Sequence, residues 1–192
     1  MYIIGLSGKA GSGKDTVGKI MHDLWGYYPL PLSLMVKLDA ISKWGISYEA
    51  AFIKKPPAVR KLLQEIGTEN GRDQYGKEMW IRGTHAFAKW INETWGIDKF
   101  VITDIRFINE LEYLKDTGSK VIRVIADATL HETFGLKGNA ARHISETELD
   151  SVPITDYDAT IFNEFNKFEY LQEQVEDALI KITWGMHKGE SQ

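Results

Sequence analysis

The sequence predicts an α/β fold in three layers, α/β/α, with a parallel sheet of about five strands between the helices. Short runs of β-branched and aromatic residues alternate along the chain with segments whose apolar residues recur every three or four positions. The short runs are apolar throughout, as in strands that are covered on both faces. Strands that alternate with helices form parallel βαβ units with right-handed crossovers, which is the basis for this fold class.

Each expected element follows from its residues. The expected strands cover residues 2–6, 30–34, 100–104, 121–125 and 159–162, and the second is the weakest because prolines flank its start. Helices are expected behind a glycine-rich segment as far as Trp25, at 35–44, behind Pro57, at 79–95, from 107 to Gly118, and from 168 to 182. Residues 127–143 are polar and contain glycine, which predicts an exposed excursion. Trp80 is expected in the core rather than as a platform for a base.

The length of 192 residues suits one domain with mobile sub-lobes. We expect a core of about 1–34, 99–126 and 157–184, a helical lobe of about 35–96 and a lid of about 127–150. With 43% hydrophobic and 26% charged residues, the composition is that of a globular protein rather than a disordered one.

The charge balance restricts the possible partners. The chain has 23 basic and 27 acidic residues, a net charge of −4, which disfavours a protein that coats nucleic acid. This net charge still allows a small anionic ligand to be bound by a few basic side chains at one site. The absence of cysteine excludes disulfides, thiolate zinc sites and thiol catalysis, and it suits a reducing cytoplasm. No apolar run of about 18 residues and no signal peptide is apparent, so we expect a soluble cytoplasmic protein.

A phosphate-binding motif follows the first expected strand. Residues 8–16 are Gly-Lys-Ala-Gly-Ser-Gly-Lys-Asp-Thr, and Gly8, Gly13 and Lys14 match the P-loop pattern. Glycines let successive backbone N–H groups curl around a phosphate, the following helix adds its positive dipole end, and the lysine reaches the outer phosphates. The strand before the motif and the helix after it favour this interpretation over a glycine-rich turn. The sequence therefore predicts nucleotide contacts from Gly8, Gly11, Ser12, Gly13, Lys14, Asp15 and Thr16.

The metal ligands depart from the general motif. Asp15 stands where the motif has the hydroxyl residue that binds magnesium, and Thr16 comes one place later, as in nucleoside monophosphate kinases. Asp15 either orients a metal-bound water or an acceptor hydroxyl, or stabilises the start of the helix. Asp104 ends an apolar strand, as a second carboxylate on the magnesium side would, although aspartate is also a common turn former. Thr16 and Asp104 are the predicted metal ligands.

Several polar residues outside the loop are candidates for substrate contacts. Arg60, Gln64 and Arg72 flank the apolar stripe at 59–66, where a solvated helix face is the alternative. Lys137 and Arg142 lie in the glycine-containing segment 127–150, where cations would close over the phosphates and exclude water, or would belong to an ordinary surface loop. The predicted substrate-binding residues are Arg60, Gln64, Arg72, Lys137 and Glu146, and the predicted catalytic residues are Lys14, Asp15, Arg106 and Arg142. Ser145 and Asn109 are better explained as helix caps.

Taken in order, four blocks resemble the deoxynucleoside monophosphate kinases of bacteriophages and their bacterial relatives. They are the motif at 8–16, Leu-Leu-Gln-Glu-Ile-Gly-Thr-Glu at 62–69 with Arg72, Val-Ile-Thr-Asp-Ile-Arg-Phe-Ile-Asn-Glu at 101–110, and Arg-His-Ile-Ser-Glu at 142–146. The resemblance implies a P-loop kinase fold with a helical lobe that binds the acceptor and a lid. It also implies that Arg142 is the lid arginine and that Asp158 to Asn163 border the adenine.

The activity implied by this resemblance is the Mg²⁺-dependent transfer of the ATP γ-phosphate to a deoxynucleoside monophosphate, giving the diphosphate and ADP. Its partners would be small nucleotides rather than a nucleic-acid polymer or a membrane. The protein would act in the cytoplasm, which is the host cytoplasm if the protein is viral. A homodimer is possible. The alternatives are a kinase of another small acceptor, such as phosphomevalonate or dephospho-coenzyme A, and an ATP-binding switch without transfer chemistry.

Overall fold

The computed structural model describes residues 1–135, 137 and 143–189, without the side chains of residue 131 and residues 184–189. The chain divides into two compact units. One comprises Met1–Pro29 and Ile97–Gln192, and the other comprises Leu30–Gly96. The first unit contains the sheet and the second is helical.

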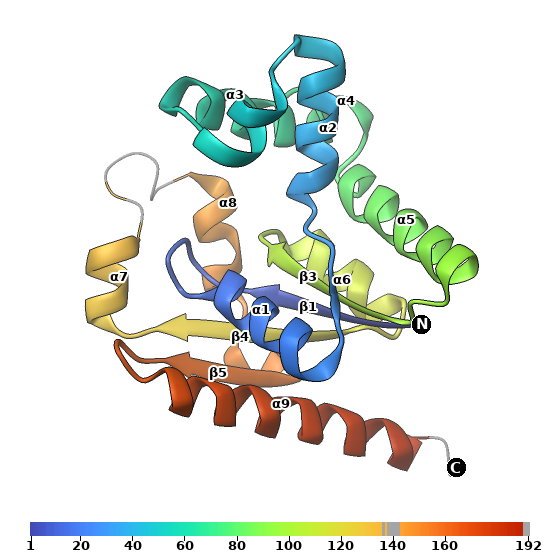
Figure 1. Ribbon diagram of the computed structural model, residues 1–192, viewed down its shortest axis with the longest axis vertical. Helices are drawn as coiled ribbons and strands as arrows, with labels where there is room; N and C mark the ends of the chain where they lie inside the picture. Colours follow the sequence, from blue (N-terminus) through green and yellow to red (C-terminus); the bar gives the residue numbers. More distant parts are fainter. Residues whose placement is uncertain (136, 138–142, 190–192) are drawn as a thin grey trace. The chain divides into compact units, whose positions relative to one another are not determined.

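A five-stranded sheet forms the centre of the first unit (Figure 1). Its strands stand in the order β2 (Tyr28–Pro29), β3 (Lys99–Ile105), β1 (Tyr2–Ser7), β4 (Lys120–Ala126) and β5 (Ala159–Asn163). All neighbouring strands are parallel, which confirms the predicted parallel sheet. The carboxyl ends of β1 and β3 meet, because Ser7 pairs with Ile105. The P-loop motif and the residues that follow β3 therefore begin at one edge of the sheet.

Helices cover both faces of this sheet. Helix α1 (Lys14–Trp25) and helix α9 (Phe168–Gly189) share one core with the strands, which includes Leu6, Val17, Met21, Ile161 and Val175. Helix α6 (Ile108–Asp116) lies on the other face. There a Cβ on Gly5 would stand 2.6 Å from Leu114 Cδ1, so glycine permits the close approach of the helix to β1. The three-layer α/β/α prediction is confirmed.

The second unit consists of helices. These are α2 (Ser33–Trp44), the π-helical segment η1 (Glu49–Lys54), α3 (Pro57–Gly67), α4 (Arg72–Tyr75) and α5 (Met79–Trp95). Val36, Ala40, Ile66 and Trp80 form its buried core. The Trp80 indole donates to the Gly67 carbonyl oxygen at 3.0 Å, so its buried polar atom has a partner. Trp80 is 7% exposed, which confirms the prediction that it is a core residue.

The strand predicted at 30–34 is wrong. The β2 strand has two residues and ends at Pro29, and α2 begins at Ser33. Between them the chain forms a turn with two backbone hydrogen bonds between residues three apart. Leu34 N donates to the Pro31 oxygen and Met35 N donates to the Leu32 oxygen, both at 3.0 Å. Pro31 has no N–H to donate to a sheet, which favours this turn over a longer strand.

The other short elements lie in the second half of the chain. Residues predicted as an exposed excursion include a helix, α7 (Ala128–Phe134), where Asp127 Oδ1 accepts from Leu130 N at 2.7 Å. After it come α8 (Ile144–Thr147) and the 3₁₀ turns η3 (Glu148–Ser151) and η4 (Ile154–Asp156). In the part of the chain that the structure describes, no helix is long and apolar enough to cross a bilayer.

Two predicted helix caps are wrong. His143, rather than Ser145, precedes α8, and its ring nitrogen Nδ1 faces both the Ser145 amide and the Ser145 hydroxyl. Asn109 lies inside α6, and the amides before that helix bind Glu110 instead. Glu110 Oε2 accepts from Arg106 N at 2.9 Å and from Phe107 N at 3.1 Å.

Candidate functional site

The loop between β1 and α1 folds around the side chain of its own lysine. Lys14 Nζ donates to the Gly8 and Lys9 carbonyl oxygens at 2.6 and 2.7 Å. Ser12 N closes a turn onto the Lys9 oxygen at 3.1 Å. Ser12 Oγ is buried and has no hydrogen-bond partner among the described residues. The lysine therefore crosses the loop, with its ammonium group held at the carboxyl edge of the sheet.

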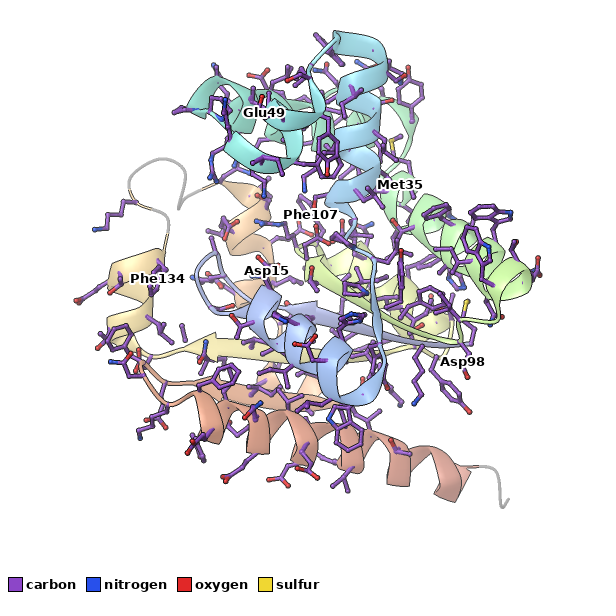
Figure 2. All side chains as sticks on the ribbon, viewed as in Figure 1. Asp15, Met35, Glu49, Asp98, Phe107 and Phe134 are labelled. Atoms are coloured by element: carbon purple, nitrogen blue, oxygen red, sulfur yellow. The ribbon has the colours of Figure 1, made fainter. Side chains whose placement is uncertain are left out.

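Two glycines of this loop stand where a side chain does not fit. Gly13 has φ +91°, and a Cβ there would lie 2.1 Å from Asn163 Nδ2. Gly11 has φ +78°, and a Cβ there would lie 2.5 Å from the backbone carbon of Phe134. Figure 2 marks Phe134 at the end of α7 and Asp15 at the beginning of α1, on the two helices next to the loop. Both glycines are therefore required by conformation and by space.

Asn163 contacts the loop directly. This residue ends β5, and its side-chain amide donates from Nδ2 to the Ser12 carbonyl oxygen at 3.0 Å. The amide is buried. The bond fixes the middle of the loop to the end of a strand that comes about 150 residues later in the chain, and each such bond typically contributes about 1 kcal/mol.

The lysine has an unusual electrostatic environment. Burial, followed by the nearby Arg106 guanidinium, lowers the pKa of Lys14 to about 8. The carboxylates of Glu146, Asp15 and Asp104 act in the opposite direction. This site concentrates positive charge where solvent screening is small, which favours the binding of a polyanion.

Arg106 follows β3 and is oriented by an acidic residue from a distant segment. Its Nη1 is paired with Glu146 Oε1, and Glu146 Oε2 accepts from the Ala10 amide of the loop at 2.8 Å. The Glu146 side chain is only 4% exposed. One carboxylate therefore joins the strand end at Arg106 to the phosphate-binding motif.

The possible metal ligands are two oxygen donors near the loop. Thr16 is exposed in the first turn of α1, and Asp104 is half-buried near the carboxyl end of β3. Hydroxyl and carboxylate oxygens are ligands that Mg²⁺ prefers, and Mg²⁺ usually takes only one or two carboxylates from a protein, with phosphates and waters completing its coordination. The residue types of Thr16 and Asp104 therefore fit magnesium. Among the described residues, no group of three histidine, aspartate or glutamate side chains forms a closed metal site.

A second set of contacts to the loop has no signal in the sequence. Lys9 Nζ pairs with Asp150 Oδ2 at 2.7 Å, and the Arg123 guanidinium lies 3.7 Å from Asp150 Oδ1. Arg123 also donates to Ser7 Oγ at 2.9 Å. Lys9 belongs to a variable position of the motif and Asp150 lies in the 3₁₀ turn η3, so no spacing rule connects them.

Asp158 lies away from the loop. It precedes β5, and its Oδ2 accepts from Val121 N at 2.8 Å while Oδ1 pairs with Lys120 Nζ at 3.0 Å. Asn163 stands five residues further along the strand, about 16 Å away at the usual rise. The structure therefore brings Asn163, but not Asp158, to the phosphate-binding loop.

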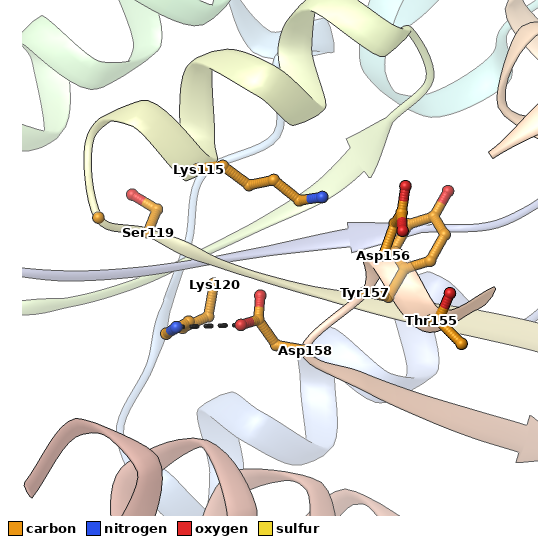
Figure 3. A pocket seen from close by; sticks show the side chains of 8 residues that line it. Lys115, Ser119, Lys120, Thr155, Asp156, Tyr157 and Asp158 are labelled. Atoms are coloured by element: carbon orange, nitrogen blue, oxygen red, sulfur yellow. Dashed lines mark ion pairs between the residues drawn. The ribbon is translucent and has the colours of Figure 1, made fainter. Parts of the chain in front are cut away.

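Figure 3 shows the surroundings of Asp158. A cavity of about 240 Å³ opens there, between the end of α6 and the start of β5. It is lined by Lys115, Gly118, Ser119, Lys120, Thr155, Asp156, Tyr157 and Asp158. Because it borders the beginnings of β4 and β5, this cavity is separate from the loop after β1.

A second cavity lies at the carboxyl ends of β4 and β5. Its volume is about 330 Å³, and Asn163 belongs both to its wall and to the contact with the loop. The other lining residues are Ile125, Ala126, Asp127, Phe162, Glu164 and Tyr170. Ligands of parallel sheets collect at this edge, so the cavity offers space for a ligand next to the loop after β1.

The remaining candidates are described within their own units. In the helical unit, Arg60 is exposed and donates from Nε to the Lys55 oxygen at 2.9 Å, Gln64 is half-buried, and Arg72 is buried at the start of α4. In the other unit, Lys137 is exposed. Arg142 falls outside the described residues.

Known proteins resemble this chain in sequence and in fold. The model of the family described as deoxynucleotide monophosphate kinase matches residues 35–175. A protein of Acanthamoeba polyphaga mimivirus, named "Putative deoxynucleotide monophosphate kinase", is 28% identical over 183 residues, which cover 85% of this chain and 89% of the viral protein.

Among solved structures, a Thermus thermophilus protein superposes with a TM-score of 0.51 at 18% identity, covering 93% of this chain and 96% of that one. The shikimate kinase of Aquifex aeolicus reaches a TM-score of 0.47 at 16% identity, covering 96% of this chain and 98% of its own. At these identities the likeness to the T. thermophilus structure supports the fold alone.

Proposed function

This chain belongs to the deoxynucleotide monophosphate kinase family, and we propose that it transfers the γ-phosphate of ATP to a deoxynucleoside monophosphate, with Mg²⁺. The observation that carries the proposal is the buried ammonium group of Lys14, held across a glycine-rich loop between a parallel strand and a helix. Phosphoryl transfer requires positioning and stabilisation of charge rather than covalent chemistry by the protein, and this loop would supply both.

The loop and its neighbours would bind ATP. The loop amides and Lys14 would hold the phosphates, and the cavity next to Asn163 would take the adenine. Thr16 and Asp104 would hold Mg²⁺, which supplies charge neutralisation to the phosphates when it is bound. Asp15, exposed in the first turn of α1, would stabilise the start of that helix or orient a water of the metal.

Several of the residues predicted from the sequence would serve the acceptor. Gln64 and Arg72, together with Arg60, would contact the monophosphate nucleotide, and Lys137 and Arg142 would serve the lid. An oxygen of the acceptor phosphate attacks the γ-phosphorus, the bond from this phosphorus to the β,γ-bridging oxygen breaks, and ADP leaves with the electron pair. Arg106 would neutralise the charge that develops on the transferred group.

An acceptor panel tests this proposal. The purified protein is mixed with Mg-ATP and each of the four deoxynucleoside monophosphates, and nucleoside diphosphates are measured by chromatography. We expect one or more of the four to be phosphorylated. Phosphomevalonate and dephospho-coenzyme A are run in parallel. Phosphorylation of one of these two, with none of the four deoxynucleoside monophosphates phosphorylated, would show that the acceptor belongs to another class.

The variant Lys14→Ala tests whether the loop takes part in the reaction. Lys14→Ala should reduce kcat/KM by about three or more orders of magnitude, because it removes the buried ammonium group from the phosphates. Its circular dichroism spectrum should remain that of the wild type. The matched control is Lys19→Ala, which removes an exposed lysine of the same helix that pairs with Asp23. Near-normal activity of Lys14→Ala would remove this loop from the mechanism.

A further inference from the structure

A short acidic segment, residues 143–151, contacts the phosphate-binding loop. We call residues 143–151 the brace. It contains α8 and η3, and three of its carboxylates reach other parts of the same unit. Glu146 binds Ala10 N and Arg106, Glu148 Oε1 accepts from Ile108 N at 2.8 Å, and Asp150 pairs with Lys9.

Glu146 makes the contacts that indicate most clearly what the brace does. Its side chain is 4% exposed, and its two oxygens have different partners, a loop amide and the Arg106 guanidinium. A buried carboxylate is costly unless it is paired and hydrogen-bonded, and this one satisfies both conditions. Loss of its charge would leave Arg106 without this partner, and loss of the whole side chain would also leave the Ala10 amide without an acceptor.

Two roles are consistent with this carboxylate. It could stand in the place of a phosphate and leave when the nucleotide arrives, or it could stay and position its partners. The other contacts of the brace favour the second role. Leu149 is buried, Glu148 holds the amide at the start of α6, and Asp150 is bonded to the first half of the loop and lies near Arg123. Displacement of Glu146 would require several of these contacts to break together.

We propose that the brace is a fixed wall of the active site, in which Glu146 is a positioning residue for Arg106 and for the Ala10 amide. This inference rests on the proposed phosphoryl transfer. The sequence predicted Glu146 as a substrate-binding residue; in this proposal it acts through its partners Arg106 and Ala10 N. It holds the guanidinium at the end of β3 and the first half of the loop in one arrangement, so that the charge on the transferred group meets a cation that is already oriented.

Three variants separate the parts of this role. Glu146→Gln keeps an acceptor for the Ala10 amide and removes the charge that holds Arg106. Glu146→Ala removes both, and Glu146→Asp keeps the charge but shortens its reach. The control is Glu169→Gln, an exposed glutamate in the first turn of α9.

The kinetic expectation is a separation of kcat from KM. For Glu146→Gln, kcat should fall by about 100-fold while the KM for ATP changes by less than about threefold, because misplacement of a charged group costs the transfer step and most loop contacts remain. Glu146→Asp should recover part of kcat, and Glu169→Gln should match the wild type. A wild-type kcat for Glu146→Gln would overturn the proposal. So would a tighter binding of ATP, because that is expected of a carboxylate that the nucleotide displaces.

A second readout does not depend on turnover. In ¹⁵N-labelled protein without nucleotide, the Ala10 amide should show a changed resonance and faster hydrogen exchange in Glu146→Ala but not in Glu169→Gln. If the resonance and the hydrogen exchange of the Ala10 amide are unchanged in folded Glu146→Ala, the inferred contact between Glu146 and Ala10 N is wrong. If the wild type phosphorylates none of the acceptors, the proposed function fails, and the Ala10 amide still decides whether Glu146 holds the loop.

Discussion

The lowered pKa of Lys14 predicts a pH dependence for nucleotide binding. The pKa falls from 10.5 to about 8 because burial, and then Arg106, disfavour the charged ammonium group. A bound triphosphate places negative charge beside this ammonium and should return the pKa toward its ordinary value. Between these two pH values the complex then holds more protons than the free protein, so the affinity must fall as the pH rises through about 8.

The magnitude follows from the fraction of protonated lysine. With a pKa of about 8, the free protein is about 90% protonated at pH 7 and about 10% protonated at pH 9. Binding of ATP at pH 9 should therefore be about tenfold weaker than at pH 7, which corresponds to about 1.4 kcal/mol. It should also take up about 0.9 proton per nucleotide at pH 9, against about 0.1 at pH 7.

Isothermal titration calorimetry measures both quantities, because the proton uptake appears when buffers of different ionisation enthalpy are compared. Titrations of ATP in the absence of an acceptor at pH 7, 8 and 9 give the affinities. Lys14→Met should bind more weakly with little change from pH 7 to 9, whereas Lys19→Met should retain the wild-type dependence. The reasoning is refuted if the wild type binds equally well at pH 7 and 9, or if Lys14→Met keeps the tenfold change.

Two further predictions concern the backbone of the loop and the residue that holds it. Gly13→Ala should abolish ATP binding and lower the free energy of unfolding in urea by more than Gly26→Ala does, because a Cβ at 13 would meet Asn163 whereas position 26, at φ +72°, has open space. Gly26→Ala, the control, should lower the free energy of unfolding by about 1 kcal/mol, because alanine is disfavoured in the left-handed conformation. An equal decrease for Gly13→Ala and Gly26→Ala would refute the steric argument. Asn163→Ala should cost about 1–3 kcal/mol in the same assay and raise the KM for ATP, because the Ser12 oxygen loses its buried donor. An unchanged KM would show that the loop keeps its shape without this bond.

The sequence predicted the elements that depend on neighbouring residues. The apolar runs at 2–6 and 100–104 became β1 and β3, and the periodic segment at 79–95 became α5. The P-loop motif was found because its glycines, its lysine and the strand before it lie within 14 residues. Local propensity failed at 30–34, where a proline ends the strand, and at 128–134, where Asp127 starts a helix inside a polar segment.

The wrong helix caps have a related cause. Ser145 and Asn109 fitted the spacing of capping residues, but His143 and Glu110 hold the amides at the two helix starts. Several side chains can reach the same amides over two or three residues. The direction of the incoming chain selects among them, and that direction is set by packing outside the segment.

By itself, the sequence determined the order of strands and helices, the phosphate-binding loop and the residue types at the strand ends, because these features depend on periodicity and on short spacings. Only the tertiary structure decided which distant side chains meet that loop. Ala10 and Glu146 are 136 residues apart in the chain, and Lys9 and Asp150 are 141 apart. Likewise, only the tertiary structure showed that Asn163 contacts the loop whereas Asp158 binds Lys120 and Val121. Such contacts arise when the whole sheet assembles, and no local pattern of residues records them.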